Sequence, residues 1–178
     1  MGTVADSLNY IMENFSNLKS VDEELIERIC NILLSSQSIF VYGVGRSGII
    51  GRTFTMRLVQ LGLKAYFVGE TITPVVGNKD VVILISGTGE TQGTLLVAQI
   101  SKRVNAKVVS LTAEKESPLS KVSDFTILLK VNKSSDLAPL GTLFELSTIT
   151  LFDAMVALLM KMNKETEEDL RKRHAIWL

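Results

Sequence analysis

Residues 38–48 read Ser-Ile-Phe-Val-Tyr-Gly-Val-Gly-Arg-Ser-Gly, and this stretch decides the fold. Its first five residues are rich in β-branched and aromatic side chains, which is typical of a short buried strand. The glycines that follow permit a tight turn, and residues 49–61 then have helical spacing until Gly62 stops the pattern. We therefore expect strand, glycine turn and helix in direct succession.

The same order recurs along the chain. Further strands are expected where short apolar runs stand between polar turns, at residues 64–68, 80–85, 107–111 and 124–129. Helices are expected at residues 4–15, 21–34, 92–103 and 139–162, with a short segment near Pro118 and a Ser20–Glu23 capping box at the start of the second helix. Strands and helices that alternate at this spacing predict a three-layer α/β/α sandwich around a five-stranded parallel sheet.

Length and composition favour one globular unit. The chain has 178 residues, of which 46% are hydrophobic and 21% charged, and these values exclude a disordered chain, a collagen-like repeat and a disulfide scaffold. We expect a single domain over residues 1–178, with N-terminal helices in 1–36, an α/β core in 37–162 and a C-terminal tail in 163–178.

Charge and cysteine content restrict the partners. Lys plus Arg and Asp plus Glu both total 19, so we expect neither a nucleic-acid partner nor a membrane surface. One cysteine and one histidine cannot form an internal disulfide or a zinc cluster, and Cys30 is expected to be a buried thiol without chemistry. The first twenty residues carry Asp6 and Glu13 and do not resemble a signal peptide, so we expect a soluble, cytoplasmic protein whose mature chain starts at Met1.

Two loops stand where an open parallel sheet binds ligands, at the carboxyl ends of its strands. One is residues 43–48, and the other is residues 86–91, Ser-Gly-Thr-Gly-Glu-Thr, with three hydroxyls and two glycines. Hydroxyls and backbone N–H groups at a helix N-terminus are what a phosphate monoester requires. The sequence therefore predicts a phosphate site where the two loops converge.

Two alternatives stay open at this point. Residues 43–48 fit the G-x-G-x-x-G dinucleotide pattern, and Glu70 lies near the distance expected of a ribose-binding acid. That interpretation leaves residues 86–91 unexplained and leaves little chain for a substrate domain. Alternatively, both loops are ordinary turns and helix caps.

Gly45-Arg46-Ser47 and residues 86–91 resemble the phosphosugar loops of the sugar isomerase (SIS) domain superfamily. Residues 68–74, 138–145 and 171–175 are similar to one member family, 6-phospho-3-hexuloisomerase, so the resemblance covers nearly the whole chain. It implies a flavodoxin-like SIS fold and a cytoplasmic, tetrameric enzyme without metal or cofactor. It also implies the conversion of D-arabino-hex-3-ulose 6-phosphate to fructose 6-phosphate in the ribulose monophosphate pathway, which serves formaldehyde assimilation.

The resemblance assigns the substrate phosphate to four hydroxyl side chains, those of Ser47, Ser86, Thr88 and Thr91. Thr88 stands where serine is common in the superfamily. The replacement keeps the hydroxyl and adds a methyl group, which leaves the geometry of this contact open.

Moving a carbonyl from C3 to C2 requires a base that takes the C2 proton and returns a proton to C3 through an enediol. Glu145 is the only charged residue between Asp136 and Asp153, and its apolar surroundings suit a group that takes up a proton near neutral pH. Thr142 and Glu145 also have the spacing of a capping box, so the residues alone leave both roles open. The matching position in the superfamily is the isomerase base, which favours catalysis.

Two further residues are candidates for catalysis. Arg46 could hold substrate oxygens or the developing enediolate charge, or it could be a solvated loop arginine. His174, the only histidine, could shuttle a hydroxyl proton during ring opening in a neighbouring subunit's site, or it could simply complement a helix dipole.

Other functions on the same fold also stay open, namely another phosphosugar aldose-ketose isomerase or a non-catalytic phosphosugar-binding module. The helix at 139–162 carries apolar residues on nearly every side, and the opening helix is too short to be stable alone. We therefore expect a homo-oligomer, by resemblance a tetramer, with active sites shared through the His174 tail.

Overall fold

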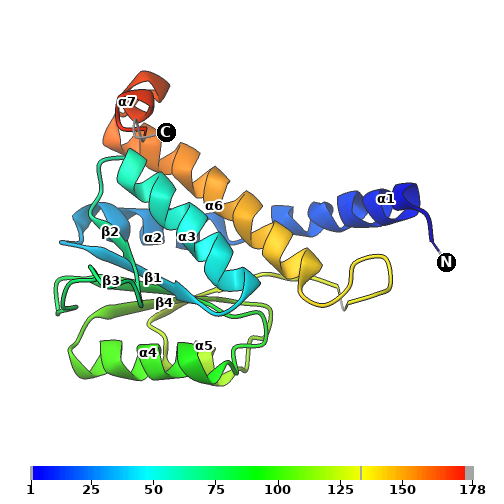
Figure 1. Ribbon diagram of the computed structural model, residues 1–178, viewed down its shortest axis with the longest axis horizontal. Helices are drawn as coiled ribbons and strands as arrows, with labels where there is room; N and C mark the ends of the chain where they lie inside the picture. The colour runs from blue at the N-terminus through cyan, green and yellow to red at the C-terminus, as the bar shows by residue number, and fades with distance from the viewer. Residues whose placement is uncertain (1, 133, 175–178) are drawn as a thin grey trace.

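Five parallel strands form the centre of the computed structural model, which describes residues 2–132 and 134–174 (Figure 1). The strands are β1 (Ile39–Gly43), β2 (Ala65–Phe67), β3 (Val81–Ile85), β4 (Lys107–Thr112) and β5 (Phe125–Leu128). Their order is β2-β1-β3-β4-β5, and every neighbouring pair is parallel. The chain runs outward from β1 to β2 and then returns to β3, so the order reverses between β1 and β3, where open α/β sheets bind ligands.

Helices cover both faces of this sheet, and the predicted three-layer sandwich is confirmed. They are α1 (Val4–Asn14), the 3₁₀ helix η1 (Phe15–Ser20), α2 (Glu23–Ser35), α3 (Arg46–Gln60), α4 (Gln92–Arg103), α5 (Pro118–Val122), α6 (Thr142–Asn163) and α7 (Glu167–Lys172). In Figure 1, α4 and α5 lie below the sheet, whereas α2, α3 and α6 lie above it.

The core consists of two apolar clusters, one on each face of the sheet. The larger cluster lies beneath α2, α3 and α6 and includes the stacked rings of Phe54 and Phe152, whose centroids are 4.0 Å apart. The smaller cluster lies under α4 and α5 and includes Phe40 and Leu84. All five residues of β3 are buried, as expected for a central strand that is covered on both faces.

Helix α6 is the long core helix of the larger face and packs against α2 and α3. Its length and composition would allow it to cross a membrane, but much of its surface is buried inside the protein, as in the core helix of a soluble domain. The apolar side chains that the sequence places on nearly every side of this helix pack inside the protein, because α2 and α3 flank the helix, and no large apolar residue of α6 is exposed. The exposed positions are Thr150, Asp153, Ala154, Ala157, Lys161 and Asn163.

Helix α1 projects away from the body of the molecule (Figure 1). None of its residues is buried, and the side chains of Val4, Leu8 and Met12 are exposed. An isolated helix of 11 residues is marginal in water, so this element needs a surface to pack on.

The start of α2 differs from the predicted capping box. Asp22 is the N-cap, and its carboxylate accepts a hydrogen bond of 3.1 Å from the Leu25 amide. The prediction of a Ser20–Glu23 box is wrong because η1 extends to Ser20, and Asp22 is the acceptor that directly precedes the first helical residue.

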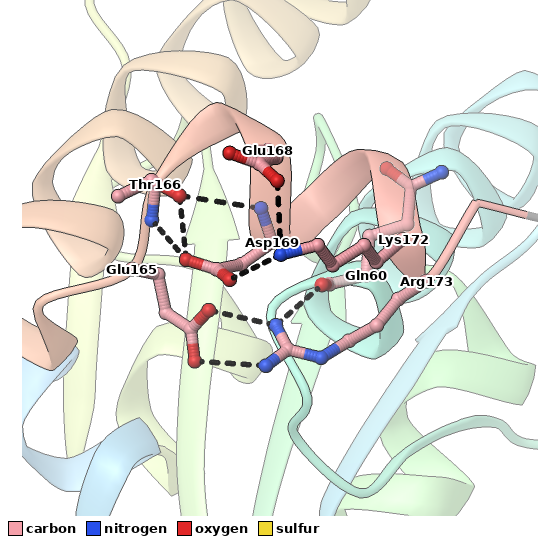
Figure 2. A network of polar contacts seen from close by, with 7 residues as sticks. All are labelled: Gln60, Glu165, Thr166, Glu168, Asp169, Lys172 and Arg173. Atoms are coloured by element: carbon pink, nitrogen blue, oxygen red, sulfur yellow. Dashed lines mark hydrogen bonds and ion pairs between the residues drawn. The ribbon is translucent and has the colours of Figure 1, made fainter.

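The C-terminal helix α7 is attached to the end of α3 by a polar network (Figure 2). The Arg173 guanidinium donates to both carboxylate oxygens of Glu165, at 2.8 and 3.1 Å, and to the Gln60 carbonyl at 3.2 Å. Thr166 and Asp169 form a capping box at the start of α7. These contacts fix where the chain carries His174, the last described residue.

Candidate active site

The two predicted loops lie side by side at the carboxyl edge of the sheet. Gly43 pairs in register with Ile85, so the chain leaves β1 and β3 at the same level. A Cβ on Gly93, in the first turn of α4, would lie 2.9 Å from the Tyr42 hydroxyl and 3.5 Å from a Val44 methyl. The start of α4 therefore packs directly against the turn that begins α3, and the two loops converge as predicted.

The turn after β1 is tighter than expected, since α3 begins at Arg46 rather than at Ile49. Gly45 has φ +61°, a conformation that favours glycine, and it allows the helix to start at the next residue. A Cβ on Gly48 would lie 2.5 Å from the Gly43 carbonyl oxygen, so this position admits only glycine. Arg46 and Ser47 thus lie in the first turn of a 15-residue helix, beside N–H groups that can bind an anion.

The loop after β3 keeps its hydroxyl groups close together. Ser86 Oγ lies 2.9 Å from Thr91 Oγ1 and also accepts a hydrogen bond of 3.1 Å from the Gly89 amide. Thr88 Oγ1 accepts a weak hydrogen bond of 3.3 Å from the Glu90 amide and is exposed. With the N-terminus of α4, this loop presents hydroxyls and amides that can surround one phosphate group.

Glu145 lies in the first turns of α6 but does not cap this helix. The N-cap is Gly141, and the Thr142 hydroxyl donates to the Pro139 carbonyl at 2.6 Å. The capping-box alternative is therefore wrong, because Thr142 is already inside the helix. The Glu145 carboxylate instead faces Arg46, with Nε 2.9 Å from Oε2.

The ion pair places Arg46 Nε beside Oε2 of Glu145 without a directed hydrogen bond between them. The Glu145 side chain is 10% exposed, against 55% for Arg46. Within the described residues Oε2 accepts no hydrogen bond, although Arg46 Nε is close, because the N–H direction does not meet hydrogen-bond geometry. A buried carboxylate oxygen without a directed donor can accept a proton or a ligand hydroxyl. A cavity of about 240 Å³ opens beside the pair, lined also by Ile49 and Ile149.

The carboxylate and the hydroxyl-rich loop are neighbours. A Cβ on Gly87 would lie 3.2 Å from the Phe144 ring, so the loop after β3 packs against the start of α6. Arg46 comes from the first loop and pairs with Glu145, the residue that follows Phe144. The structure thus brings together the two loops, Arg46 and Glu145.

His174 lies far from this site in the same chain. Glu145 is near the start of α6, and His174 follows α7, beyond the other end of α6. The eighteen helical steps from Glu145 to Asn163 alone span about 27 Å. His174 lines a groove of about 620 Å³ between α3, β2 and α7, together with Met56 and Ile72.

The acid required by the dinucleotide alternative has another partner. Glu70 forms an ion pair with Arg52 of α3, and the Arg52 guanidinium lies over the Phe67 ring, 4.0 Å from its centroid. This ion pair competes with any ribose contact.

Two residues behind the second loop, Thr112 and Ser117, are not among the residues predicted from the sequence. The Thr112 hydroxyl, at the end of β4, donates to the Gly87 carbonyl at 3.1 Å. Ser117, the N-cap of α5, lies so close that a Cβ on Gly89 would be 2.2 Å from its Oγ. The sequence feature that could have identified Thr112 is its position, since it is a hydroxyl residue at the carboxyl end of β4, the strand next to β3.

Metal-binding and thiol chemistry receive no geometric support. Within residues 2–132 and 134–174, no three His, Cys, Asp or Glu side chains are grouped to hold a metal ion. Cys30 is buried as predicted, and burial, with a contribution from Glu27, raises the pKa of its thiol to about 12.

The chain resembles known proteins along most of its length. The SIS domain model matches residues 32–160. A 3-hexulose-6-phosphate isomerase of Methanocaldococcus jannaschii is 43% identical over 85% of this chain and 81% of its own length, and one of Bacillus subtilis is 32% identical over 97% and 95%. The crystal structure of a Methanococcus jannaschii protein, from which a 3-hexulose-6-phosphate isomerase function was inferred, superposes with a TM-score of 0.91 at 38% identity and covers 97% of this chain and 99% of its own. These matches agree with the sheet order and the convergent loops, and the chain belongs to the SIS domain family.

Proposed function

We propose that this protein is a phosphosugar isomerase that interconverts D-arabino-hex-3-ulose 6-phosphate and fructose 6-phosphate. Relatives named 3-hexulose-6-phosphate isomerase support the enzyme class and suggest the reaction. The observation that carries the proposal is the nearly buried Glu145 carboxylate, which pairs with Arg46 at 2.9 Å and lies next to two phosphate-type loops. The proposed setting is the cytoplasm and the ribulose monophosphate pathway of formaldehyde assimilation.

Binding would begin at the phosphate. The first turns of α3 and α4 offer N–H groups, and the hydroxyls of Ser47, Ser86, Thr88 and Thr91 add donors around one anion. Because the loop after β3 touches the start of α6, a phosphate held there extends the sugar carbons toward Glu145.

The chemistry would be a proton transfer by one carboxylate. Glu145 takes the proton from C2, the C2–H electron pair forms the C2–C3 double bond, and the C3 carbonyl becomes an enediolate oxygen. Glu145 then returns the proton to C3, and the O2 hydroxyl passes its own proton to the enediolate oxygen on C3, which gives the C2 carbonyl and the C3 hydroxyl of fructose 6-phosphate. The Arg46 guanidinium, whose side chain is half exposed, would stabilise the negative charge of the enediolate.

His174 would act in the active site of another subunit of a homotetramer. Its separation from Glu145 within one chain argues against a role in its own site, and three exposed apolar surfaces favour assembly: α1, α3 and the segment around Ile72. In that place the imidazole could move a hydroxyl proton as the ring of fructose 6-phosphate opens. The 3-ketose has no free hydroxyl that can close a five- or six-membered ring. His174 would therefore contribute to the rate mainly in the direction that starts from fructose 6-phosphate.

The substrate assignment can be tested with a panel of ketose and aldose phosphates followed by ¹³C NMR. We expect hexulose 6-phosphate and fructose 6-phosphate to interconvert, and the other sugars to react at least about 100-fold more slowly. Preferred turnover of an aldose-ketose pair would indicate another phosphosugar isomerase. Tight binding of sugar phosphates without turnover would indicate a binding module.

A further inference from the structure

The loop after β3 is held from behind through its carbonyl groups. The Gly87 carbonyl accepts two hydrogen bonds, from the Ala113 amide at 2.9 Å and from the Thr112 hydroxyl at 3.1 Å. The Gly89 carbonyl accepts one from the Leu119 amide at 3.0 Å. The Gly87 carbonyl therefore faces the end of β4, and the Gly89 carbonyl faces the start of α5.

Peptide geometry then determines where the amides point. In a trans peptide the C=O and N–H bonds are antiparallel, so the Glu90 N–H faces away from the start of α5, and the Thr88 N–H faces away from β4. The neighbour of β3 on that side is β1, whose loop carries Arg46 and Ser47. In the part of the chain that the structure describes, the Thr88 amide meets no acceptor, and the Glu90 amide has only the long contact with the Thr88 hydroxyl.

The Thr112 hydroxyl has a fixed orientation. Thr112 is fully buried, and its Oγ1 accepts a hydrogen bond of 3.2 Å from the Glu114 amide while it donates to Gly87. One lone pair of Oγ1 therefore already accepts a hydrogen bond, and the hydroxyl proton is directed to the Gly87 carbonyl. Gly89, at φ +65°, would place a Cβ 3.2 Å from Thr112 Oγ1, which shows how closely the loop lies against this segment.

We propose that Thr112 is a positioning residue, which orients the Gly87–Thr88 peptide so that the Thr88 amide donates to the substrate phosphate. Thr112 itself touches no ligand, because it lies behind the loop. The inference rests on the proposed function in that it takes the ligand of this loop to be a phosphate.

The test compares Thr112→Val, Thr112→Ser and, as a matched control, Thr55→Val. Thr55 on α3 is also a nearly buried threonine that donates to a backbone carbonyl, that of Gly51, at 2.8 Å. Calorimetry gives Kd for inorganic phosphate, and steady-state kinetics give KM and kcat for fructose 6-phosphate. Loss of one hydrogen bond behind the loop is expected to raise Kd and KM about three- to tenfold for Thr112→Val while kcat changes less than twofold. Thr112→Ser should restore both values, and Thr55→Val should leave them unchanged.

Unchanged phosphate affinity in a folded Thr112→Val protein would overturn the inference, as would a fall in kcat alone. If this variant does not fold, the ¹⁵N-labelled wild-type protein provides the test. Its Thr88 amide resonance should shift on addition of inorganic phosphate. A Thr88 resonance that does not shift would overturn the inference. A wild-type protein that binds phosphate through this loop but isomerises no sugar phosphate would refute the proposed function alone.

Discussion

At the residue scale, two hydroxyls of the loop after β3 act as a connected pair and not as separate donors. Ser86 Oγ and Thr91 Oγ1 are 2.9 Å apart, and the Gly89 amide also donates to Ser86. Each hydroxyl therefore helps to hold the other in place, and the removal of one disturbs the contact made by its neighbour. Groups coupled in this way do not contribute additively to binding.

We predict that Ser86→Ala and Thr91→Ala each raise the KM for fructose 6-phosphate about tenfold, since a hydrogen bond to a charged group is worth about 1.5–3 kcal/mol. The double variant should raise KM by less than the product of the two single effects, by a coupling of about 1 kcal/mol. The measurement is a double-mutant cycle on KM and on Kd for inorganic phosphate. Unchanged values in all three variants would mean that the phosphate binds elsewhere.

At the element scale, strand types and helix types follow from the hydrophobic period, whereas their ends depend on side-chain partners. Helix α4 has the predicted bounds because apolar periodicity defines it. Helix α3 begins three residues earlier than predicted because Gly45 takes a positive φ, which spacing does not reveal. The start of α2 was misplaced because Ser20 and Asp22 are both good cap residues, and only the extent of η1 selects between them.

The candidate site was predictable in part for the same reason. Topology brings the loops after β1 and β3 together, so sequence and resemblance could single out Ser47, Ser86 and Thr91 as candidates for one site. The ion pair of Arg46 with Glu145 joins residues about a hundred positions apart and depends on how α6 packs on α3. Thr112 was missed because its contact with Gly87 crosses between strands, which no local spacing encodes.

The contact between Lys102 of α4 and Asp124, which directly precedes β5, makes the free energy of unfolding depend on pH. Burial by itself raises the pKa of the Asp124 carboxyl, but hydrogen bonds from Lys102 and from the Val108 amide outweigh burial and hold this pKa below its ordinary value of 3.8. A carboxyl whose pKa is lower in the folded state stabilises the protein above its unfolded-state pKa, and this contribution is lost as the pH falls through the folded-state pKa.

We predict that Asp124→Asn lowers the free energy of unfolding by about 1 kcal/mol at pH 7, a value reduced by solvent screening of a partly exposed pair. The difference from wild type should shrink as the pH falls below about 4 and through the lowered folded-state pKa of Asp124. Urea unfolding across this range measures it, with Asp153→Asn, an exposed carboxylate on α6, as control. A difference that does not change with pH would rule out the ionic contribution.

At the scale of the whole molecule, the surface predicts an assembly. The outer side of α6 is polar or small, so the exposed apolar side chains lie elsewhere. They lie on the projecting helix α1 (Figure 1), on the outer face of α3, where Ile49, Met56 and Val59 are exposed, and in the segment around Ile72. His174 lies at one end of the molecule and Glu145 near the other, so a site containing both requires two chains.

Mixing Glu145→Gln protein with His174→Ala protein, after dissociation and reassembly, should restore activity. Hybrid oligomers contain some sites that carry both native residues, whereas each parent contains none. Reassembly of each parent with itself is the control and should restore nothing. A monomer in sedimentation at micromolar concentration, or verified hybrids of impaired parents that recover no activity, would exclude shared sites.

The central claim is that the Glu145 carboxylate moves the proton between C2 and C3. Its most direct test is ¹H NMR of fructose 6-phosphate in D₂O with wild-type protein, Glu145→Gln and the Asp153→Asn control, alongside thermal unfolding. We predict that wild type and Asp153→Asn form hexulose 6-phosphate and incorporate solvent deuterium at C2 of the 3-ketose and C3 of the 2-ketose. Glu145→Gln should keep its Tm within about 2 °C and lose exchange and turnover by a factor of about 10³ or more, because an amide cannot accept the proton. A folded Glu145→Gln protein that exchanges deuterium at the wild-type rate would contradict the account.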